Sequence, residues 1–304
     1  SIIRAHENIV PGRIYFAEGE LLHASINRSP TAYEANPEEE RLRYPHSTDK
    51  QMTQLRMMSA KGNEPLGVIN WFAVHPTSMN NTNYLISSDN VGYASILFEE
   101  SMNPGAIIGK GGFVAAFASS NLGDVSPNIN GPRCIDTGEP CDMLSSTCNG
   151  ETGKCISSGP GKDMYESTKI IAERMYGKAK ELYSDPSAKE IIGPVKAIHQ
   201  YVDMPSQKIT YYNRRSRSLT EAKGCLPAMG YSFGAGTTDG PGAYVFRQST
   251  TTDNPLWNMF RNAIHEPSEQ QKECQGQKPI LLPTGEVCST YFSVVVHIIG
   301  QLPL

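Results

Sequence analysis

The sequence of 304 residues contains no run of 18 or more apolar residues, so no stretch of it predicts a membrane-spanning helix. It also lacks a strong excess of either charge: the formal net charge is -4 and the sequence pI is about 6.0. A chain without a basic excess gives no electrostatic reason to expect a nucleic-acid partner. Its hydrophobic content of 38% is instead typical of a soluble globular protein with a sizeable core.

Familiar nucleotide-binding motifs are also missing. Ser126 is flanked by Val125 and Pro127, so it does not lie in a Gly-x-Ser-x-Gly elbow. No Ser/His/Asp order is evident either, which makes a metal-independent serine hydrolase the weakest interpretation. Residues 230–242 carry five glycines, but they lack both Gly-x-Gly-x-x-Gly spacing and a Gly-Lys-Ser/Thr ending. We therefore expect a flexible or tightly turned loop there, not a phosphate-binding loop.

Four of the seven cysteines recur every seven residues, from Cys134 to Cys155, in a loop that has little apolar material. Such a loop needs covalent stabilisation, which favours disulfides. A four-cysteine zinc site is the alternative, but structural zinc sites favour cysteines in close pairs, and none of these four is separated from the next by only two to four residues. Four cysteines allow three disulfide pairings, and the spacing does not choose among them.

Strand-like and helix-like patterns alternate along the first two thirds of the chain. This alternation predicts an α/β fold, with a central mixed sheet, flanking helices and a disulfide-stapled loop. Asp89 or Asn90 is expected to cap one of the helices. We expect strands at residues 13–17, 54–58, 66–74, 113–118 and 195–204, and helices at residues 38–43, 91–102, 163–182 and 255–264.

The loop that follows strand 113–118 reads Asn-Leu-Gly-Asp-Val-Ser-Pro-Asn-Ile-Asn-Gly-Pro-Arg-Cys at residues 121–134. A strand that ends in a turn supports loop side chains rigidly, and reactive groups commonly lie in such places. The hydroxyl of Ser126 is therefore the first candidate for catalysis. A Ser before Pro in a loop rich in Gly and Asn is more often a plain turn residue, and the local pattern alone favours that interpretation.

His75 and Arg28 are two further candidates, and their local patterns favour ordinary structural roles. His75 follows the apolar strand 66–74, where an imidazole could bind a metal, but a metal site needs several ligands gathered in space. Arg28 lies in a loop, where an arginine is normally a solvated surface charge.

Several motifs together resemble the neutral ceramidases. Gly-Asp-Val-Ser-Pro-Asn, followed by Gly-Pro-Arg-Cys, is similar to the long and specific amidase signature of that family. The resemblance covers nearly all of residues 1–286. Further matching motifs are Ile-Asn-Arg-Ser-Pro at 26–30, Phe-Ala-Val-His-Pro at 72–76, Ser-Asp-Asn-Val-Gly-Tyr-Ala-Ser at 88–95, and Gly-Tyr-Ser-Phe at 230–233 with Ala-Gly-Thr at 235–237.

This resemblance implies a zinc-dependent amidohydrolase that cleaves the N-acyl bond of ceramide to sphingosine and a free fatty acid. Ceramide is then the partner molecule, met at a membrane surface, and the expected location is extracellular or at the cell surface. Ser126 is the implied catalytic residue, either as a nucleophile or as a hydroxyl that positions the substrate. Arg28 is the implied substrate-binding residue, and His75 is an implied zinc ligand.

The resemblance also implies a disulfide pairing and marks where the chain departs from the family. The implied pairs are Cys134 with Cys148, Cys141 with Cys155, and Cys225 with Cys274, which leaves Cys288 over. We expect residues 1–286 to be a partial catalytic domain and residues 287–304 to be a divergent tail that resembles no part of the family.

Only one of the implied zinc ligands, His75, lies in the sequence. The others, a second histidine, a glutamate and a tyrosine, are expected before Ser1 and beyond Glu286, as is the family's immunoglobulin-like C-terminal domain. The alternative function is therefore a truncated, non-catalytic secreted fragment that lacks most zinc ligands.

Two glycosylation sequons, at Asn27 and Asn80, are compatible with an oxidising compartment. The first lies within a motif that matches the family, so we do not expect Asn27 to carry sugar. No signal peptide is visible and the sequence does not start with Met, so Ser1 is interpreted as a cut edge.

Overall fold

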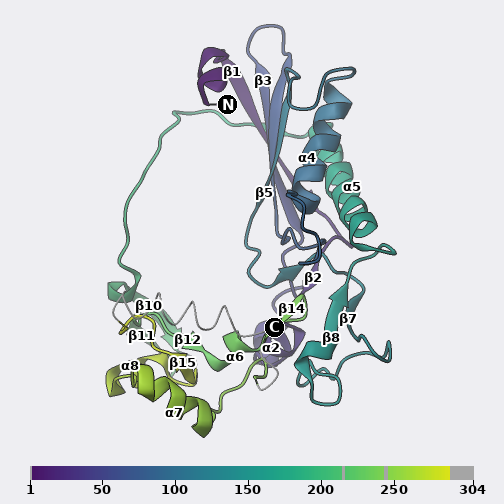
Figure 1. Ribbon diagram of the computed structural model, residues 1–304. Coiled ribbons are helices and arrows are strands. Elements are labelled where there is room, and N and C mark those ends of the chain that lie inside the picture. Colours follow the sequence, from purple (N-terminus) through teal and green to yellow (C-terminus); the bar gives the residue numbers. More distant parts are fainter. Residues whose placement is uncertain (1, 214–215, 243–245, 288–304) are drawn as a thin grey trace. The chain divides into compact units, whose positions relative to one another are not determined.

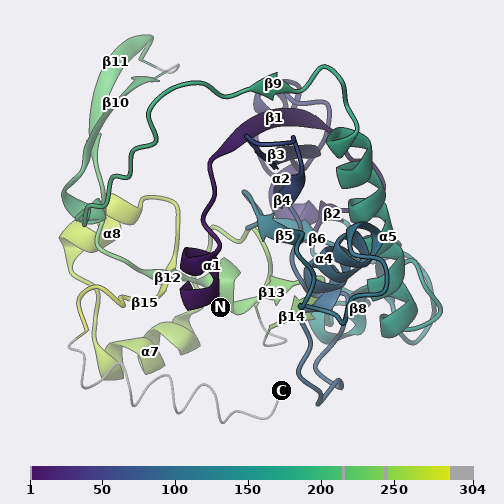
Figure 2. The same cartoon turned by 90° about the horizontal axis from the view of Figure 1, so that it is seen from above.

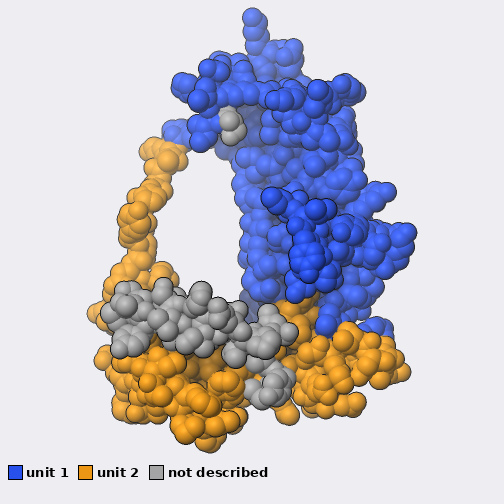
Figure 3. All heavy atoms as spheres, viewed as in Figure 1, with its two compact units in different colours: residues 1–133, 156–195 blue, residues 134–155, 196–304 orange. Residues whose placement is uncertain are grey.

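The computed structural model describes residues 2–213, 216–242 and 246–287, which form two compact units (Figure 3). The first unit consists of Ser1–Arg133 and Ile156–Val195, and the second of Cys134–Cys155 and Lys196–Leu304. Among the described residues, no helix is both long enough and apolar enough to cross a membrane.

A five-stranded mixed sheet, in the order β5-β4-β3-β1-β9, forms the centre of the first unit (Figure 1). Neighbouring strands are antiparallel except β4 and β5, which are parallel. The turn between β3 and β4 contains Gly62 and Asn63, both with positive φ, which Gly and Asn tolerate best. The strands are β1 (Gly12–Glu20), β3 (Gln51–Ser59), β4 (Pro65–Phe72), β5 (Val114–Ser119) and β9 (Lys189–Glu190).

Two long helices, α4 (Asp89–Met102) and α5 (Met164–Tyr183), pack on one face of this sheet and against each other (Figures 1 and 2). Helix α4 connects β4 to the parallel strand β5, because a parallel neighbour requires a crossover. Apolar residues of α5 recur at spacings of three and four, as expected for a helix with one buried stripe. The buried residues of this stripe are Thr168, Ile171, Met175, Ala179 and Leu182.

The core of the first unit lies between these helices and the sheet. Phe98 of α4 is fully buried, and its ring contacts those of Phe113, Tyr176 and Tyr183 at centroid distances of 5.6–5.7 Å. A polar contact joins the same layers: the Gln54 Nε2 amide donates to Asn70 Oδ1 and to the Ala179 carbonyl oxygen, each at 2.7 Å. The sheet and α5 are thus held by both apolar packing and hydrogen bonds.

Short elements complete the first unit and connect it to the cysteine loop. Strand β2 pairs with β6, and β7 pairs with β8, from which the cysteine loop extends. These elements are α1 (Ile2–Glu7), α2 (Pro30–Glu34), α3 (Glu38–Arg41), β2 (Ile26–Asn27), β6 (Val125–Ser126), β7 (Gly131–Cys134), β8 (Cys155–Ser158) and the single turn Thr152–Lys154.

The second unit has small sheets and short helices around a small apolar cluster. Tyr231, Ala235 and Phe246 are buried together, and Trp257 and Leu281 pack against them. The elements are a turn at Met204–Ser206, the hairpin β10 (Lys208–Asn213) and β11 (Ser218–Lys223), the pair β12 (Met229–Gly230) and β15 (Ile280–Leu282), the pair β13 (Gly236–Thr237) and β14 (Gly240–Pro241), and helices α6 (Tyr231–Gly234), α7 (Pro255–Ile264) and α8 (Glu269–Gln275).

The α/β class with a central mixed sheet is confirmed, but the strand predicted at residues 195–204 is wrong. Residues 194–203 have no regular secondary structure, and Val195, Ile198 and Tyr201 are about nine-tenths exposed. Alternating apolar residues make a strand only when a neighbouring strand bonds to the backbone. Among the described residues, no strand pairs with this segment. The glycine-rich residues 230–242 are tightly turned, with α6 followed by the β13–β14 pair.

Candidate active site

The Ser126 loop and the Arg28 loop are joined by a short antiparallel pairing. In this β2–β6 pair, Ile26 lies opposite Ser126 and Asn27 lies opposite Val125. The pairing continues by one bond, because the Arg28 backbone N–H donates to the Asp124 carbonyl oxygen at 2.8 Å. Two motifs that lie about a hundred residues apart in the sequence are therefore neighbours in the structure.

His75 comes to the same place because of the parallel strands. The residues that follow β4 and β5 leave the sheet at the same edge, and the Ser120 N–H donates to the Phe72 carbonyl oxygen there at 3.2 Å. His75 lies three residues beyond β4, and Ser126 lies seven beyond β5. The carboxyl edge of parallel strands is the usual location of ligand sites in α/β sheets.

The His75 ring is oriented by a backbone carbonyl of the Ser126 loop. Its Nδ1 lies 2.8 Å from the carbonyl oxygen of Val125. A carbonyl oxygen only accepts, so Nδ1 carries a hydrogen, and in the neutral ring the lone pair is then on Nε2. Histidines that bind metals commonly donate their other ring N–H to a carbonyl in this way. The ring of His75 is thus prepared to offer Nε2 as one metal ligand.

Ser126 is fully buried, at 0% exposure, and its Oγ accepts a hydrogen bond of 2.9 Å from the Asn128 backbone N–H. This is the local turn that its sequence context favours. The Asn128 side chain then donates to the Thr77 carbonyl oxygen at 3.3 Å, which ties this turn to the loop after His75. Ser126 is therefore both a turn residue and a neighbour of the other candidates.

Asp89 and Asn90 do not cap α4 as expected. Ser88 lies at the cap position without a side-chain cap bond, and Asp89 has a positive φ of 53°. The Asp89 carboxylate instead accepts from the backbone N–H groups of Ser78 and Met79, at 3.1 and 2.8 Å. The fully buried Asn90 donates through Nδ2 to the His75 carbonyl oxygen at 3.2 Å. Both residues hold the loop that carries His75, a role that the capping pattern did not predict.

Arg28 is half-buried beside the same loop, and its Nε donates to the Gly123 carbonyl oxygen at 3.0 Å. Its neighbour Asn27 is buried, and the Asn27 Nδ2 donates to the carboxylate of Asp124 at 3.3 Å. Burial lowers the pKa of Lys50 below its ordinary value, although the nearby Asp124 and Asp49 carboxylates oppose this shift.

The two glycosylation sequons differ in exposure. The buried Asn27 amide is poorly placed to carry a glycan, whereas Asn80 is exposed.

Comparison with known proteins gives the family. The model of the neutral/alkaline non-lysosomal ceramidase N-terminal domain matches residues 1–302. The chain belongs to this family.

Ceramidases from distant organisms are similar to nearly the whole chain. A neutral ceramidase of Drosophila pseudoobscura pseudoobscura is 53% identical over 294 residues, which cover 95% of this chain and 42% of that protein. Neutral ceramidase B of Dictyostelium discoideum is 49% identical, with 94% of this chain and 40% of that protein covered. The chain thus spans about two fifths of the length of the curated relatives that it matches.

Two solved ceramidase structures share the fold. One, described as a ceramidase complexed with C2, is 31% identical with a TM-score of 0.62, and the match covers 94% of this chain and 39% of that one. The neutral ceramidase of Pseudomonas aeruginosa is 29% identical with a TM-score of 0.58, and the match covers 95% of this chain and 38% of that one.

The match to the family model runs past Glu286 to residue 302, so it does not mark residues 287–304 as separate. That boundary remains a prediction, and residues 288–304, including Cys288, lie outside the described residues.

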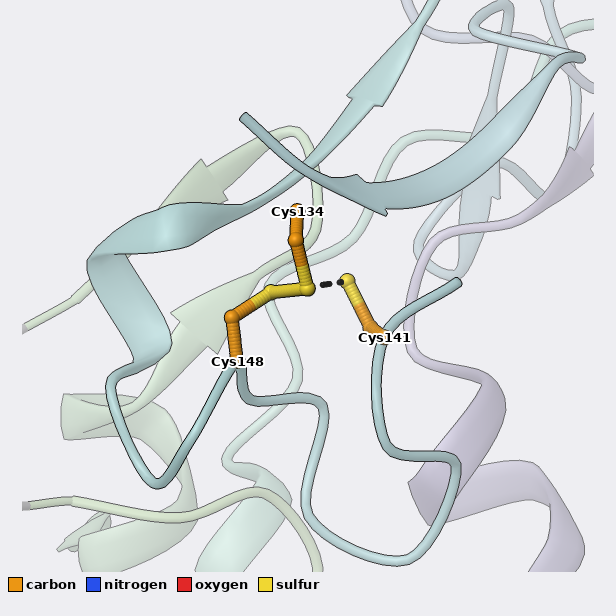
Figure 4. Close-up of side chains that lie close together, drawn as sticks. All are labelled: Cys134, Cys141 and Cys148. Atoms are coloured by element: carbon orange, nitrogen blue, oxygen red, sulfur yellow. Dashed lines mark hydrogen bonds between the residues drawn. A yellow bond between two sulfur atoms is a disulfide. The ribbon is translucent and has the colours of Figure 1, made fainter. Parts of the chain in front are cut away.

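Among the described residues, six cysteines form three disulfides: Cys134–Cys148, Cys141–Cys155 and Cys225–Cys274. These are the pairs that the resemblance implied. Within the described part of the chain, the sulfurs of Cys134, Cys141 and Cys148 are the only group of three potential metal ligands close together, within 4.8 Å (Figure 4). Because each of these sulfurs belongs to a disulfide, none is a thiolate, and the group does not bind a metal.

Proposed function

We propose that this chain is part of a zinc-dependent amidohydrolase that cleaves the N-acyl bond of ceramide, releasing sphingosine and a fatty acid. The observation that carries the proposal is the assembly around Val125. This residue pairs with the Arg28 loop through β2, accepts a hydrogen bond from His75, and immediately precedes Ser126. Three candidates from distant parts of the sequence thus surround one short segment at the carboxyl edge of β4 and β5.

Ser126 has two possible parts in this reaction, and its contacts are compatible with both. The Asn128 backbone N–H donates a hydrogen bond to Oγ, and such a bond stabilises negative charge that develops on the oxygen of an attacking nucleophile. The same bond would also hold a hydroxyl that orients the amide and relays a proton. Ser126 is fully buried, so substrate would reach it only after the surrounding loops rearrange.

His75 would hold zinc through Nε2, and the remaining ligands would come from segments outside residues 1–304. When bound, zinc supplies Lewis-acid chemistry that polarises a carbonyl and lowers the pKa of a coordinated water. The residues of this chain have supporting roles around it. Val125 fixes the tautomer of His75, Asn90 fixes its backbone, and the fork-shaped guanidinium of Arg28 would hold a polar group of the lipid.

The second candidate function is a non-catalytic secreted fragment. Two observations favour it: Ser126 is fully buried, and His75 belongs to no group of three or more potential metal ligands among the described residues. A catalytic zinc normally needs three protein ligands. For both candidates we propose an extracellular or cell-surface location, supported by the three disulfides, which persist in oxidising compartments.

The deciding experiment measures zinc content and ceramide hydrolysis together. The purified chain and a longer family member would each be analysed for bound zinc and for release of a fluorescent fatty acid from ceramide in detergent micelles. Changes equivalent to Ser126→Ala and His75→Ala would be made in both proteins. We expect the longer protein to lose at least a hundredfold in kcat with the serine change, and its zinc with the histidine change.

The behaviour of the chain itself separates the two candidates. Bound zinc and hydrolysis that depends on Ser126 would support the catalytic function for this chain. A chain that folds but has neither zinc nor activity would establish the non-catalytic candidate. Unchanged turnover of the longer protein after the serine change would remove Ser126 from the mechanism.

A further inference from the structure

A polar groove of about 770 Å³ lies in the second unit, whereas Arg28, His75 and Ser126 belong to the first. One wall is the cysteine loop, with Asp142 and Thr147. The other wall is the segment of residues 247–252, which begins with an arginine and a glutamine and continues with Ser and Thr side chains. Leu144 is the only large apolar side chain of the described residues that line the groove.

Gln248 is a buried polar side chain that faces this groove. It is 7% exposed, and its Oε1 accepts a hydrogen bond of 3.4 Å from the hydroxyl of Ser146, which is also buried. Its Nε2 amide donates to no other described residue, and it is not one of the described buried polar atoms that lack a partner, so it is open to the groove. A ligand in the groove can therefore accept a hydrogen bond from this amide.

Arg247 and Asp142 bring one charge of each sign to the groove. The Asp142 Oδ1 accepts from the Leu144 N–H, the Ser145 N–H and the Ser145 hydroxyl, at 2.8–3.0 Å. These bonds, chiefly the one from the Ser145 hydroxyl, lower the pKa of Asp142, and Arg247 contributes. The exposed guanidinium of Arg247 has no hydrogen-bond partner in the described part of the chain. The groove therefore offers strong donors and a charged acceptor, with no net charge.

The walls of the groove are preformed. The disulfides Cys134–Cys148 and Cys141–Cys155 stabilise the cysteine loop. Three residues at or beside the groove, Ser146, Asn149 and Ser249, have positive φ values of 51–55° although none is glycine. Such conformations persist where the surrounding structure enforces them, and they are concentrated at binding sites.

We propose that this groove binds a neutral carbohydrate ring. Vicinal sugar hydroxyls both donate and accept, which matches the Arg247 guanidinium, the Gln248 amide and the Asp142 carboxylate. A lipid tail does not match, because Leu144 alone offers it apolar surface. A phosphate or sulfate is disfavoured, because the negative charge of Asp142 opposes the attraction of Arg247.

The test is saturation-transfer difference NMR with the full chain and three neutral probes: the methyl glycosides of glucose, galactose and mannose. Arg247→Gln removes the guanidinium at an exposed position, and Gln248→Glu replaces the free amide donor by an acceptor of equal size. We expect at least one glycoside to bind, and each variant to weaken its binding at least tenfold. Arg217→Gln, which removes another exposed arginine of the second unit, is the matched control and should leave binding unchanged.

Inorganic phosphate and sulfate serve as competing probes. Displacement of the glycoside by either anion at equal concentration would overturn the assignment to a neutral ligand. Binding that survives Arg247→Gln would place the sugar elsewhere, and the absence of transfer to all three glycosides would remove the site. If Gln248→Glu fails to fold, judged by disulfide mapping and circular dichroism, the exposed Arg247 variant still decides the result.

Discussion

The two units of this chain are stabilised in different ways. The first has a continuous core of sixteen buried apolar residues, built from one sheet and two long helices. Among its described residues, the second has a cluster of three buried residues around Tyr231, and a separate cluster that consists only of the four disulfide-bonded cysteines of the loop. Burial of apolar surface supplies most of the folding free energy of an ordinary domain. A unit with so little of it depends on covalent links.

The reactive motifs are found in the unit with the larger core. Arg28, His75 and Ser126 all lie in loops at the edge of the packed sheet, so the first unit can hold them in place without disulfides. The glycine-rich segment, which also matches the family, lies in the second unit. We therefore expect reducing agents to disrupt the second unit, while the loops of the first unit keep their geometry.

Reduction of all three disulfides should have the largest effect. The chain-entropy model assigns about 4 kcal/mol to the Cys225–Cys274 bond, whose sequence separation is 49, and about 3 kcal/mol to each bond with a separation of 14. We expect hydrogen exchange to lose its protection in β12, β15 and the cysteine loop after reduction. Protection in β3 and α5 should remain.

Hydrogen exchange of the same peptides would be measured first in the oxidised chain and then in the reduced chain. Equal loss of protection in β3 and β12 would show that the two units unfold together, and would end the distinction between them. Replacing Cys225 and Cys274 by serine tests the longest link alone.

Phe98→Ala should have the next largest effect, and this effect is expected in the first unit. The ring is fully buried and contacts three other aromatic rings, so its removal leaves a cavity that α4 and the sheet cannot easily close. We expect a loss of about 3–5 kcal/mol in the free energy of unfolding of the first unit. Urea unfolding followed by hydrogen exchange would measure it in each unit.

Phe233→Ala is the control for this change, because Phe233 lies in the second unit and is 70% exposed. Its removal should change stability by about 0.5 kcal/mol or less. A loss of similar size from both phenylalanines would mean that burial does not distinguish the two units.

The sequence predicted the elements of the first unit better than the contacts between its loops. Apolar runs bounded by turns located β3, β4 and β5, cap and stop residues located α4, and hydrophobic periodicity located α5. The sequence could not predict that Asp89 adopts a positive φ and binds the His75 loop, since an Asp just before a helix is equally typical of a helix cap. The carbonyl of Val125 that orients His75 was also invisible, because backbone groups carry no sequence signal.

The error at residues 195–204 has a different cause. Alternating apolar residues satisfy the strand pattern, but a strand also needs a partner, and pairing between distant segments cannot be read from one segment alone. The resemblance to the ceramidases supplied what periodicity could not: the disulfide pairs and the association of Arg28, His75 and Ser126.

The smallest predicted effect comes from making one local change in both units. Asp163 caps α5 by accepting from the Glu166 N–H at 2.8 Å, and Asn254 caps α7 by accepting from the Leu256 N–H at 3.0 Å. Replacing either by alanine should cost about 1 kcal/mol. Ser88→Ala is the control, because Ser88 lies at the start of α4 without a side-chain cap bond.

The two losses should differ in where they are detected. Helix α5 is part of the packed core, so the effect of Asp163→Ala should spread through the first unit and lower the stability of β3 and α4 as well. Helix α7 is short and leaves Leu256, Met259 and Phe260 more than half exposed, so Asn254→Ala should increase hydrogen exchange mainly within α7 itself. An Asn254 variant that weakens β12 and β15 as much as α7 would show that the small cluster of the second unit is as cooperative as the large core of the first.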